Sequence, residues 1–237
     1  MTPRRSRWRA YLLLSRVSNL PTVWSNVLAG CVLGAGAVRS PVFFRLALGV
    51  SLLYTSGMFL NDAFDYESDT VSRPDRPLPA GDVSVLAAFV VGIVLMIVGE
   101  LVIAAQGETF APALWGLALA AAIIYYNIRH KRDVFGPLVM GICRGLVYCL
   151  AASAVSSSLG PAVFIAAAVM TLYVLSLTFI AKKLGPKAGV VIPLMIAGIS
   201  VVDAVVIGFA GGDAMLILAA IGAGALTLAL QRVVPGT

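Results

Sequence analysis

The sequence has little of what metal centres and disulfide scaffolds need. It holds one histidine, His130, and three cysteines among 237 residues. A single histidine excludes a multi-histidine metal site on this chain and argues against a Ser-His-Asp triad. The cysteines all fall in apolar stretches without a C-x-x-C spacing, which argues against a disulfide framework and a zinc site. We interpret them as packing residues.

Charge is also scarce. Only 12% of the residues are charged, 60% are hydrophobic, and the mean hydropathy is +0.97. The polar surface of a soluble domain of this length could not cover so much apolar material. The composition therefore predicts an integral membrane protein. We expect an all-α, polytopic helical bundle in which residues 1–237 form one transmembrane domain.

Apolar stretches of the roughly 20 residues that one membrane span needs predict about eight transmembrane helices. They lie near residues 20–38, 42–60, 84–105, 110–127, 134–155, 160–181, 189–209 and 213–231. A basic start precedes an apolar run, but Arg16 interrupts that run and no convincing cleavage site follows. We expect the first helix to be retained.

The positive charges predict the orientation. Of the 17 Lys and Arg residues, five precede the first span, two follow the second, three the fourth, three the sixth and one the eighth. The opposite side has only Arg39 and Arg45, and Arg144 lies within the fifth span. The positive-inside rule then places both termini in the cytoplasm. The net charge of +6 reflects topology, with attraction to anionic membrane lipids as a secondary effect and no case for nucleic acid.

The most polar stretch follows the second span and reads Asn61-Asp62-Ala63-Phe64-Asp65-Tyr66-Glu67-Ser68-Asp69. It carries four of the eleven acidic residues and is also on the cytoplasmic side. If the helix continues, spacings of three and four residues place Asn61, Asp62, Asp65 and Asp69 on one face. Three carboxylates on one face repel each other, so we expect a compensating cation. Mg²⁺ carrying a phosphate is the candidate, because hard cations prefer oxygen ligands.

The segment behind this stretch, residues 70–81, contains three prolines and two arginines. It is predicted to be a stiff, non-helical cover beside the carboxylates. Arg73 and Arg76 pair either with those carboxylates or with a phosphate, and their position favours a phosphate site. Asn26, inside the first span, either bonds another helix or faces a polar cavity. Asp203 is an intramembrane carboxylate whose partner the sequence does not identify.

The acidic stretch and the loop after it resemble a known signature. Asn61-Asp62-x-x-Asp65-x-x-x-Asp69 followed by Arg73-Pro74-x-Arg76-Pro77-Leu78-Pro79-Ala80-Gly81 is similar to the first motif of the UbiA-type intramembrane prenyltransferases. The resemblance extends along most of the chain, through Tyr126-Asn127 with Lys131-Arg132, and through Gly141 with Arg144-Gly145-Leu146.

The resemblance implies a Mg²⁺-dependent transferase that moves a prenyl group from an isoprenoid diphosphate to an acceptor not visible in the sequence. It assigns the metal to Asp62, Asp65 and Asp69, and catalytic roles to Asp62, Asp65 and Asn61. Magnesium and guanidiniums would neutralise the leaving diphosphate, and an apolar cavity would shield a developing allyl cation from water. The candidate substrate-binding residues are Asn26, Arg73, Arg76, Tyr126, Lys131, Arg132, Lys182 and Lys183.

The chain departs from the family at the end of the sixth span, where a second D-x-x-x-D motif is usual. No acid occurs between Asp133 and Asp203, and Lys182 and Lys183 stand in this region. The lysines either bind a phosphate in place of a metal or anchor the helix at the membrane surface. A basic sequence here is also similar to the branch of the superfamily that transfers phosphoribose to a lipid phosphate. A second departure is length, since the family typically has nine helices.

Two other classes of function stay open. A transporter is disfavoured, because its charges would be expected near the bilayer midplane and here they gather at one surface. A non-catalytic protein on the same fold is harder to exclude, because the second acidic motif is missing.

The charge distribution generates a testable prediction of topology. A reporter fused after residue 237 should report the cytoplasm, because an even number of spans returns the chain to the side where the basic loops lie. Paired fusions of a cytoplasm-active and an exterior-active reporter measure this. An exterior signal from that fusion would contradict the predicted number of spans.

Overall fold

The computed structural model describes residues 5–105, 109–129, 135–185 and 189–236. These ranges are helical and contain no β-strand. The elements in chain order are α1 (Arg7–Ser15), the 3₁₀ helix η1 (Val17–Asn19), α2 (Leu20–Ala35), α3 (Ser40–Ser72), α4 (Val85–Ala104), α5 (Ala111–Arg129), α6 (Gly136–Ser153), α7 (Pro161–Leu184), α8 (Val191–Phe209) and α9 (Ala214–Gln231).

The helices α2 to α9 correspond to the eight expected spans. Seven of them, α3 to α9, are long and apolar enough to cross a membrane. The other, α2, has 16 residues and is slightly shorter than a usual span. The prediction of an all-α membrane bundle is confirmed, and the number of eight spans is approximate.

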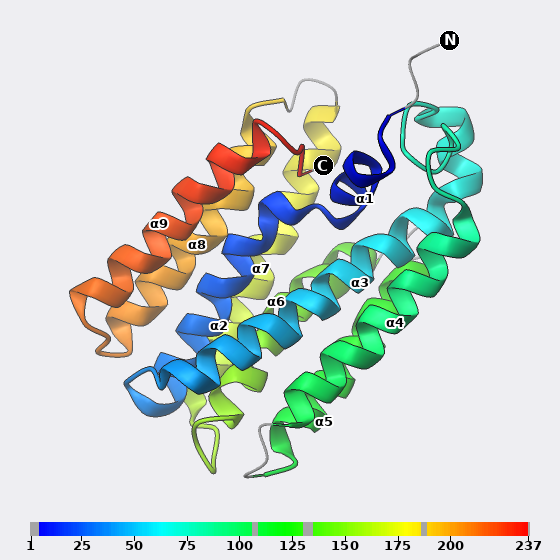
Figure 1. Ribbon diagram of the computed structural model, residues 1–237. Coiled ribbons are helices and arrows are strands. Elements are labelled where there is room, and N and C mark those ends of the chain that lie inside the picture. The colour runs from blue at the N-terminus through cyan, green and yellow to red at the C-terminus, as the bar shows by residue number, and fades with distance from the viewer. Residues whose placement is uncertain (1–4, 106–108, 130–134, 186–188, 237) are drawn as a thin grey trace.

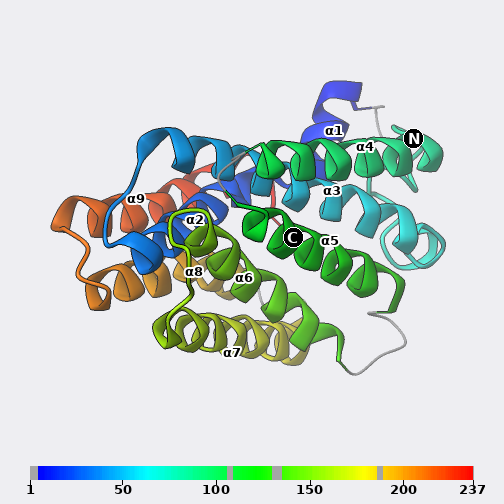
Figure 2. The ribbon, with the colours of Figure 1, turned by 90° about the horizontal axis from the view of Figure 1, so that it is seen from below.

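The helix α2 lies inside the bundle and the other helices surround it (Figures 1 and 2). It contacts α3, α6, α8 and α9. In Figure 1, α8 and α9 lie on one side of α2, whereas α4 and α5 lie on the other. Large apolar side chains remain exposed on the outer helices, for example Val90, Val94 and Ile97 on α4. This is the pattern expected where the solvent outside the bundle is lipid.

Small residues allow α2 and α6 to approach closely. A Cβ atom at Gly30 would lie 2.6 Å from the Cβ of Ala151, and one at Gly34 would lie 2.7 Å from the carbonyl oxygen of Ala152. These contacts are too short for a larger residue, so the G-x-x-x-G spacing on α2 serves helix packing.

Asp203 on α8 joins three helices in the interior. Its carboxylate accepts hydrogen bonds from the Ser25 hydroxyl (2.6 Å) and the Asn26 amide (3.3 Å) of α2, and from the Tyr148 hydroxyl (2.6 Å) of α6. Asp203, Asn26 and Tyr148 are fully buried. Of the two alternatives for Asn26, the structure shows the helix-to-helix hydrogen bond. The structure also identifies the partners of Asp203, which the sequence alone does not show.

Replacing Asp203 by Ala should lower the thermal unfolding midpoint. The change leaves the buried hydroxyl of Tyr148 without its acceptor, which costs on the order of 1 to 3 kcal/mol. Thermal unfolding of the detergent-purified protein measures it. The matched control is Val201→Ala on the same helix, since Val201 is 53% exposed and should matter little. Equal midpoints for the two variants would contradict a stabilising role of Asp203.

Candidate active site

The acidic stretch continues α3 as a helix to Ser72 and forms one buried face at its end. Asn61, Asp62, Asp65 and Asp69 are between 5% and 8% exposed. The helix therefore continues through this stretch and places the four residues on one face, as their spacing predicted. Its polar face divides in two, because Asn61 and Asp65 line an internal cavity while Asp62 and Asp69 form ion pairs.

Two arginines hold Asp62 and Asp69. Nη1 of Arg76 lies 3.2 Å from Asp62 Oδ1 and 2.7 Å from Asp69 Oδ2, and Nη2 of Arg16 lies 3.1 Å from Asp62 Oδ1. The repulsion among the carboxylates is thus offset by side chains of the protein itself. The prolines of the loop after α3 hold Arg76 in non-helical backbone beside the acids, as predicted, and of the two proposed partners Arg76 contacts the carboxylates.

Arg16 belongs to this site although the sequence pointed only to its role in orientation. It separates α1 from η1 and has left-handed backbone angles, φ 46° and ψ 44°. Such a conformation is uncommon for a residue other than glycine and is found where the surrounding structure requires it. Here the sharp turn brings the guanidinium to Asp62. A basic residue just before the first span was the available signal.

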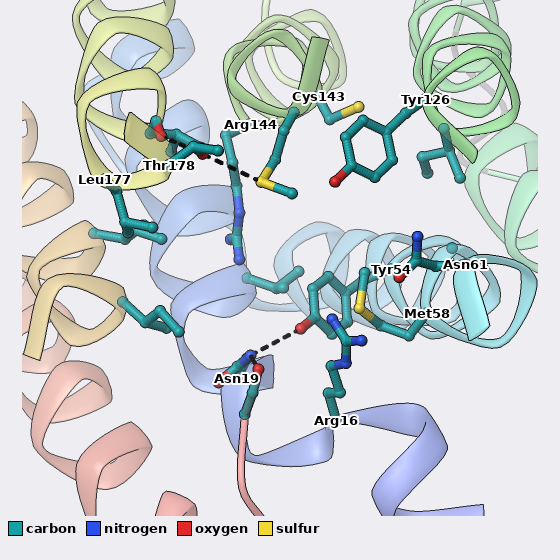
Figure 3. A pocket seen from close by; sticks show the side chains of 18 of the residues that line it. Arg16, Asn19, Tyr54, Met58, Asn61, Tyr126, Cys143, Arg144, Leu177 and Thr178 are labelled. Carbon is teal, nitrogen blue, oxygen red and sulfur yellow. Dashed lines mark hydrogen bonds between the residues drawn. The ribbon is translucent and has the colours of Figure 1, made fainter. Parts of the chain in front are cut away.

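A cavity of about 440 Å³ opens beside this face (Figure 3). Its polar side chains are contributed by α3, the loop after it, the segment before α2, α5, α6 and α7. The remaining lining is mostly apolar and comes largely from α3, α5, α6, α7 and α8. The polar lining residues include Arg16, Asn19, Tyr54, Asn61, Asp65, Arg73, Arg76, Tyr126, Asn127 and Arg144, and the apolar ones include Val50, Leu119, Ile123, Met140, Val147, Val174, Leu177, Ile192, Ile196 and Ile199.

The predicted substrate-binding residues fall into three groups. Arg73, Arg76 and Tyr126 line the cavity. Lys131 and Arg132 lie outside the described residues. Asn26, Lys182 and Lys183 are described and do not line the cavity.

Helical periodicity explains why the two lysines are displaced. The cavity face of α7 consists of Val174, Leu177, Thr178 and Ala181, which follow the three-and-four spacing of one helix face. Lys182 and Lys183 come next in the sequence and are rotated off that face, so both are exposed. The structure therefore does not bring them to the acidic residues as phosphate ligands.

A second polar group lies further along the cavity and was not among the predicted site residues. Arg144 donates from Nη1 to the carbonyl oxygen of Thr22 (3.1 Å) and from Nη2 to the Thr22 hydroxyl (3.0 Å). Its guanidinium lies 5.7 Å from the ring centre of Tyr54, a cation–π contact. The amide of Asn19 donates to the Tyr54 hydroxyl at 3.1 Å. The signal in the sequence was a single arginine inside an apolar span.

The residues fit a magnesium ion only if a substrate supplies most of its ligands. Among the described residues, no group of three or more His, Cys, Asp or Glu side chains is placed to hold a metal. Arginines pair with Asp62 and Asp69 here, so the expectation that Asp62, Asp65 and Asp69 act as one set of ligands stays a prediction. Asp65 and Asn61 line the cavity, and Mg²⁺ commonly binds one or two carboxylates together with phosphate oxygens and water.

Comparison with known proteins identifies the family of this chain. The model of the UbiA prenyltransferase family matches residues 23–236. The chain belongs to the UbiA prenyltransferase family. The match includes the acidic end of α3 and every helix from α3 to α9, and it confirms the resemblance carried by the acidic motif and its loop.

Curated UbiA relatives share part of the chain. A digeranylgeranylglyceryl phosphate synthase of Methanoculleus marisnigri is 31% identical over 59% of this chain and 49% of its own length. That of Sulfolobus acidocaldarius is 33% identical over 54% and 45%. A protoheme IX farnesyltransferase of Protochlamydia amoebophila is 26% identical over 69% and 59%. The chain thus spans about half the length of the curated relatives it matches.

A solved structure concerned with digeranylgeranylglyceryl phosphate synthase in membranes has a similar fold. It superposes with a TM-score of 0.61 over 97% of this chain and 88% of that one, at 20% identity. The likeness covers nearly all of this chain, which supports one UbiA-type arrangement of the helices from end to end.

The ion pairs predict different effects for two arginines of the same loop. Arg76→Gln should lower the thermal unfolding midpoint, because it removes a charge-assisted contact to Asp62 and Asp69 worth about 1.5 to 3 kcal/mol. Arg73→Gln is the matched control, since Arg73 is exposed and forms no ion pair with another described residue. Thermal unfolding without ligand compares them. An equal change in both midpoints would show that the ion pairs of Arg76 contribute nothing.

Proposed function

We propose that this chain is a membrane-embedded prenyltransferase that moves a prenyl group from an isoprenoid diphosphate to an acceptor. The observation that carries the proposal is the two-part lining of the cavity. Asp65, Asn61, Arg73 and Arg76 meet at one end, and apolar side chains from five helices form the walls beyond. An isoprenoid diphosphate has the same division into a charged head and an apolar chain. The names of the relatives, synthases and farnesyltransferases of prenyl compounds, support this proposal.

In the proposed reaction the bond between C1 of the prenyl chain and the diphosphate oxygen breaks, and its electron pair leaves with the diphosphate. An acceptor atom forms the new bond to C1 and releases its proton. Arg73 and Arg76 would bind the diphosphate oxygens, while Asn61 and Asp65 would position the head group. Mg²⁺, held by Asp65 and by phosphate oxygens, would act as a Lewis acid that stabilises the leaving group.

Charge balance supports the need for such a cation. The formal charges of Asp62, Asp65 and Asp69 are offset by those of Arg16, Arg73 and Arg76 around the site. A diphosphate entering this balanced cluster brings several uncompensated negative charges. UbiA prenyltransferases are generally Mg²⁺-dependent, and a magnesium ion that enters with the diphosphate would restore the balance.

The cavity walls would protect the reaction. A carbon that develops positive charge at C1 reacts with water wherever water is present, so the apolar walls favour the intended acceptor. The ring of Tyr126 lines the cavity and would stabilise positive charge through its electron-rich face. We place this end of the cavity at the cytoplasmic surface, from the distribution of basic residues.

Phosphoribose transfer has no support from the residues that line the cavity. It depended on the basic sequence at Lys182 and Lys183, which lie outside the cavity lining. A transporter likewise finds no support among the described lining residues, because their carboxylate, Asp65, lies near the end of α3.

Asp65→Asn should weaken Mg²⁺-dependent binding of geranylgeranyl diphosphate at least about tenfold, because it removes a charged metal ligand worth more than 1.4 kcal/mol. Ligand-induced thermal stabilisation, with and without Mg²⁺ and with phosphoribosyl diphosphate as the comparison donor, measures the effect.

The matched control is the double substitution Lys182→Gln with Lys183→Gln, which removes charge outside the cavity and should leave affinity for the diphosphate unchanged. Wild-type affinity in Asp65→Asn, or a preference of the wild-type protein for phosphoribosyl diphosphate, would overturn the proposed donor.

A further inference from the structure

The segment that follows α9, residues 232–236, turns back to the bundle and reaches the cavity. Three of its first four residues are exposed, whereas Gly236 is buried and belongs to the cavity lining. In Figure 1 this segment is the red coil that leaves the end of α9 and crosses toward the other helices. We call residues 232–236 the strap. It supplies one piece of a wall that is otherwise built by helices and by segments far earlier in the chain.

One side chain holds the strap against the cavity. The Asn19 amide donates to the carbonyl oxygen of Gly236 (3.0 Å) and to the Tyr54 hydroxyl (3.1 Å), and its oxygen accepts from the Gln231 amide at the end of α9 (2.8 Å). Both N–H groups of Asn19 are therefore used, and the residue is only 5% exposed. Figure 3 shows Asn19 bonded to Tyr54 where the red coil of the strap reaches the cavity.

The contact between the strap and Asn19 is tight but small. A Cβ atom at Gly236 would overlap the Asn19 amide oxygen and would lie 2.9 Å from Nε2 of Gln231. The N–H groups of Val233 and Val234 bond the Leu230 carbonyl in the last turn of α9, so these bonds do not tie the strap to the cavity. A net hydrogen bond changes an equilibrium by about two- to tenfold. The strap can therefore leave the cavity without unfolding of the helices.

The strap lies at the same end of the bundle as the acidic face of α3. Asn19 follows Arg16 by three residues, and Arg16 pairs with Asp62. A charged group is costly in the hydrocarbon part of a membrane, so an anionic molecule is expected to reach the cavity from this polar end. A segment that covers part of this end is therefore placed to control such entry.

We propose that the strap is a gate at the polar end of the cavity. The bond from Asn19 to Gly236 holds it closed, and release of this bond opens a path for charged molecules between water and the cavity. The gate concerns access alone, so it does not depend on which reaction the cavity performs.

Cys143 supplies a native reporter of access. It lines the cavity, whereas Cys31 and Cys149 are buried and lie outside the lining. The test uses the full chain in lipid nanodiscs and measures the rate of Cys143 modification by peptide mass spectrometry. Sulfonatoethyl methanethiosulfonate is the anionic reagent that arrives from water. N-cyclohexylmaleimide is the uncharged reagent that also arrives through the lipid.

Gly236→Ala should raise the rate of Cys143 modification by the anionic reagent about two- to tenfold, because the added methyl group pushes the strap away from Asn19. The rate follows the open fraction when the gate opens and closes faster than the reagent reacts. Gln231→Ala should act in the same direction, since it removes the bond that orients the Asn19 amide. The rate with the uncharged reagent should stay as in the wild type.

Two matched controls should change neither rate. Gly222→Ala adds the same methyl group on α9, where no heavy atom lies within 4 Å of it, and Arg232→Gln changes an exposed residue of the strap itself. Thermal unfolding midpoints verify that each variant is folded. Because Gln231→Ala adds no bulk, it keeps the inference testable if Gly236→Ala does not fold.

Two results would overturn the gate. One is a wild-type rate of Cys143 modification by the anionic reagent in folded Gln231→Ala and Gly236→Ala. The other is an equal acceleration with both reagents, because that would show a general loosening of helix packing instead of an opening toward water.

Discussion

The ion pairs at the end of α3 are the constraint on which the site depends. Three carboxylates on one helix face cannot be buried together unless positive charge meets them. Arg16 arrives from the segment before α2 and Arg76 from the loop after α3, so the pairing ties together parts of the chain that are separate in sequence. Arg5 adds a contact from the N-terminal segment to the same loop, at the carbonyl oxygen of Asp75.

This pairing also decides which polar groups face inward. With Asp62 and Asp69 engaged by arginines, Asn61 and Asp65 are the members of the acidic face that line the cavity. The loop after α3 brings Arg76 to Asp62 and Asp69, whereas Asn61 and Asp65 face the cavity. Two polar residues of this face therefore line the cavity, and the ion pairs beside them hold the end of α3 in position.

The bundle has hydrogen-bonded polar residues in its interior and apolar side chains on its outer surface. Lipid-facing helices expose Val, Ile and Leu side chains, whereas the buried Asp203 connects α2, α6 and α8 through neutral donors. Hydrogen bonds of this kind and the close contact of α2 with α6 at Gly30 fix the wall that carries Arg144.

Much of the fold follows from local properties of the chain. Apolar length and the scarcity of charge determined a helical membrane bundle, because spans must satisfy their backbone hydrogen bonds internally. The spacing of Asn61, Asp62, Asp65 and Asp69 determined a shared face, since helical periodicity depends only on positions along the chain. Arg76 could be predicted as a partner of the acidic residues because it follows them closely in the sequence.

What the sequence could not decide is how segments far apart meet. The partnership of Arg16 with Asp62, the convergence of Arg144 with Tyr54 and Asn19, and the partners of Asp203 join residues on different helices, and no spacing along the chain encodes such distances. The same limit applies to Lys182 and Lys183, which are near the site in the order of spans but rotated away from it. The sequence shows which residues are polar and on which helix each of them lies. Only the packing of the helices decided which of those residues share a cavity, because that depends on the rotation of each helix about its own axis.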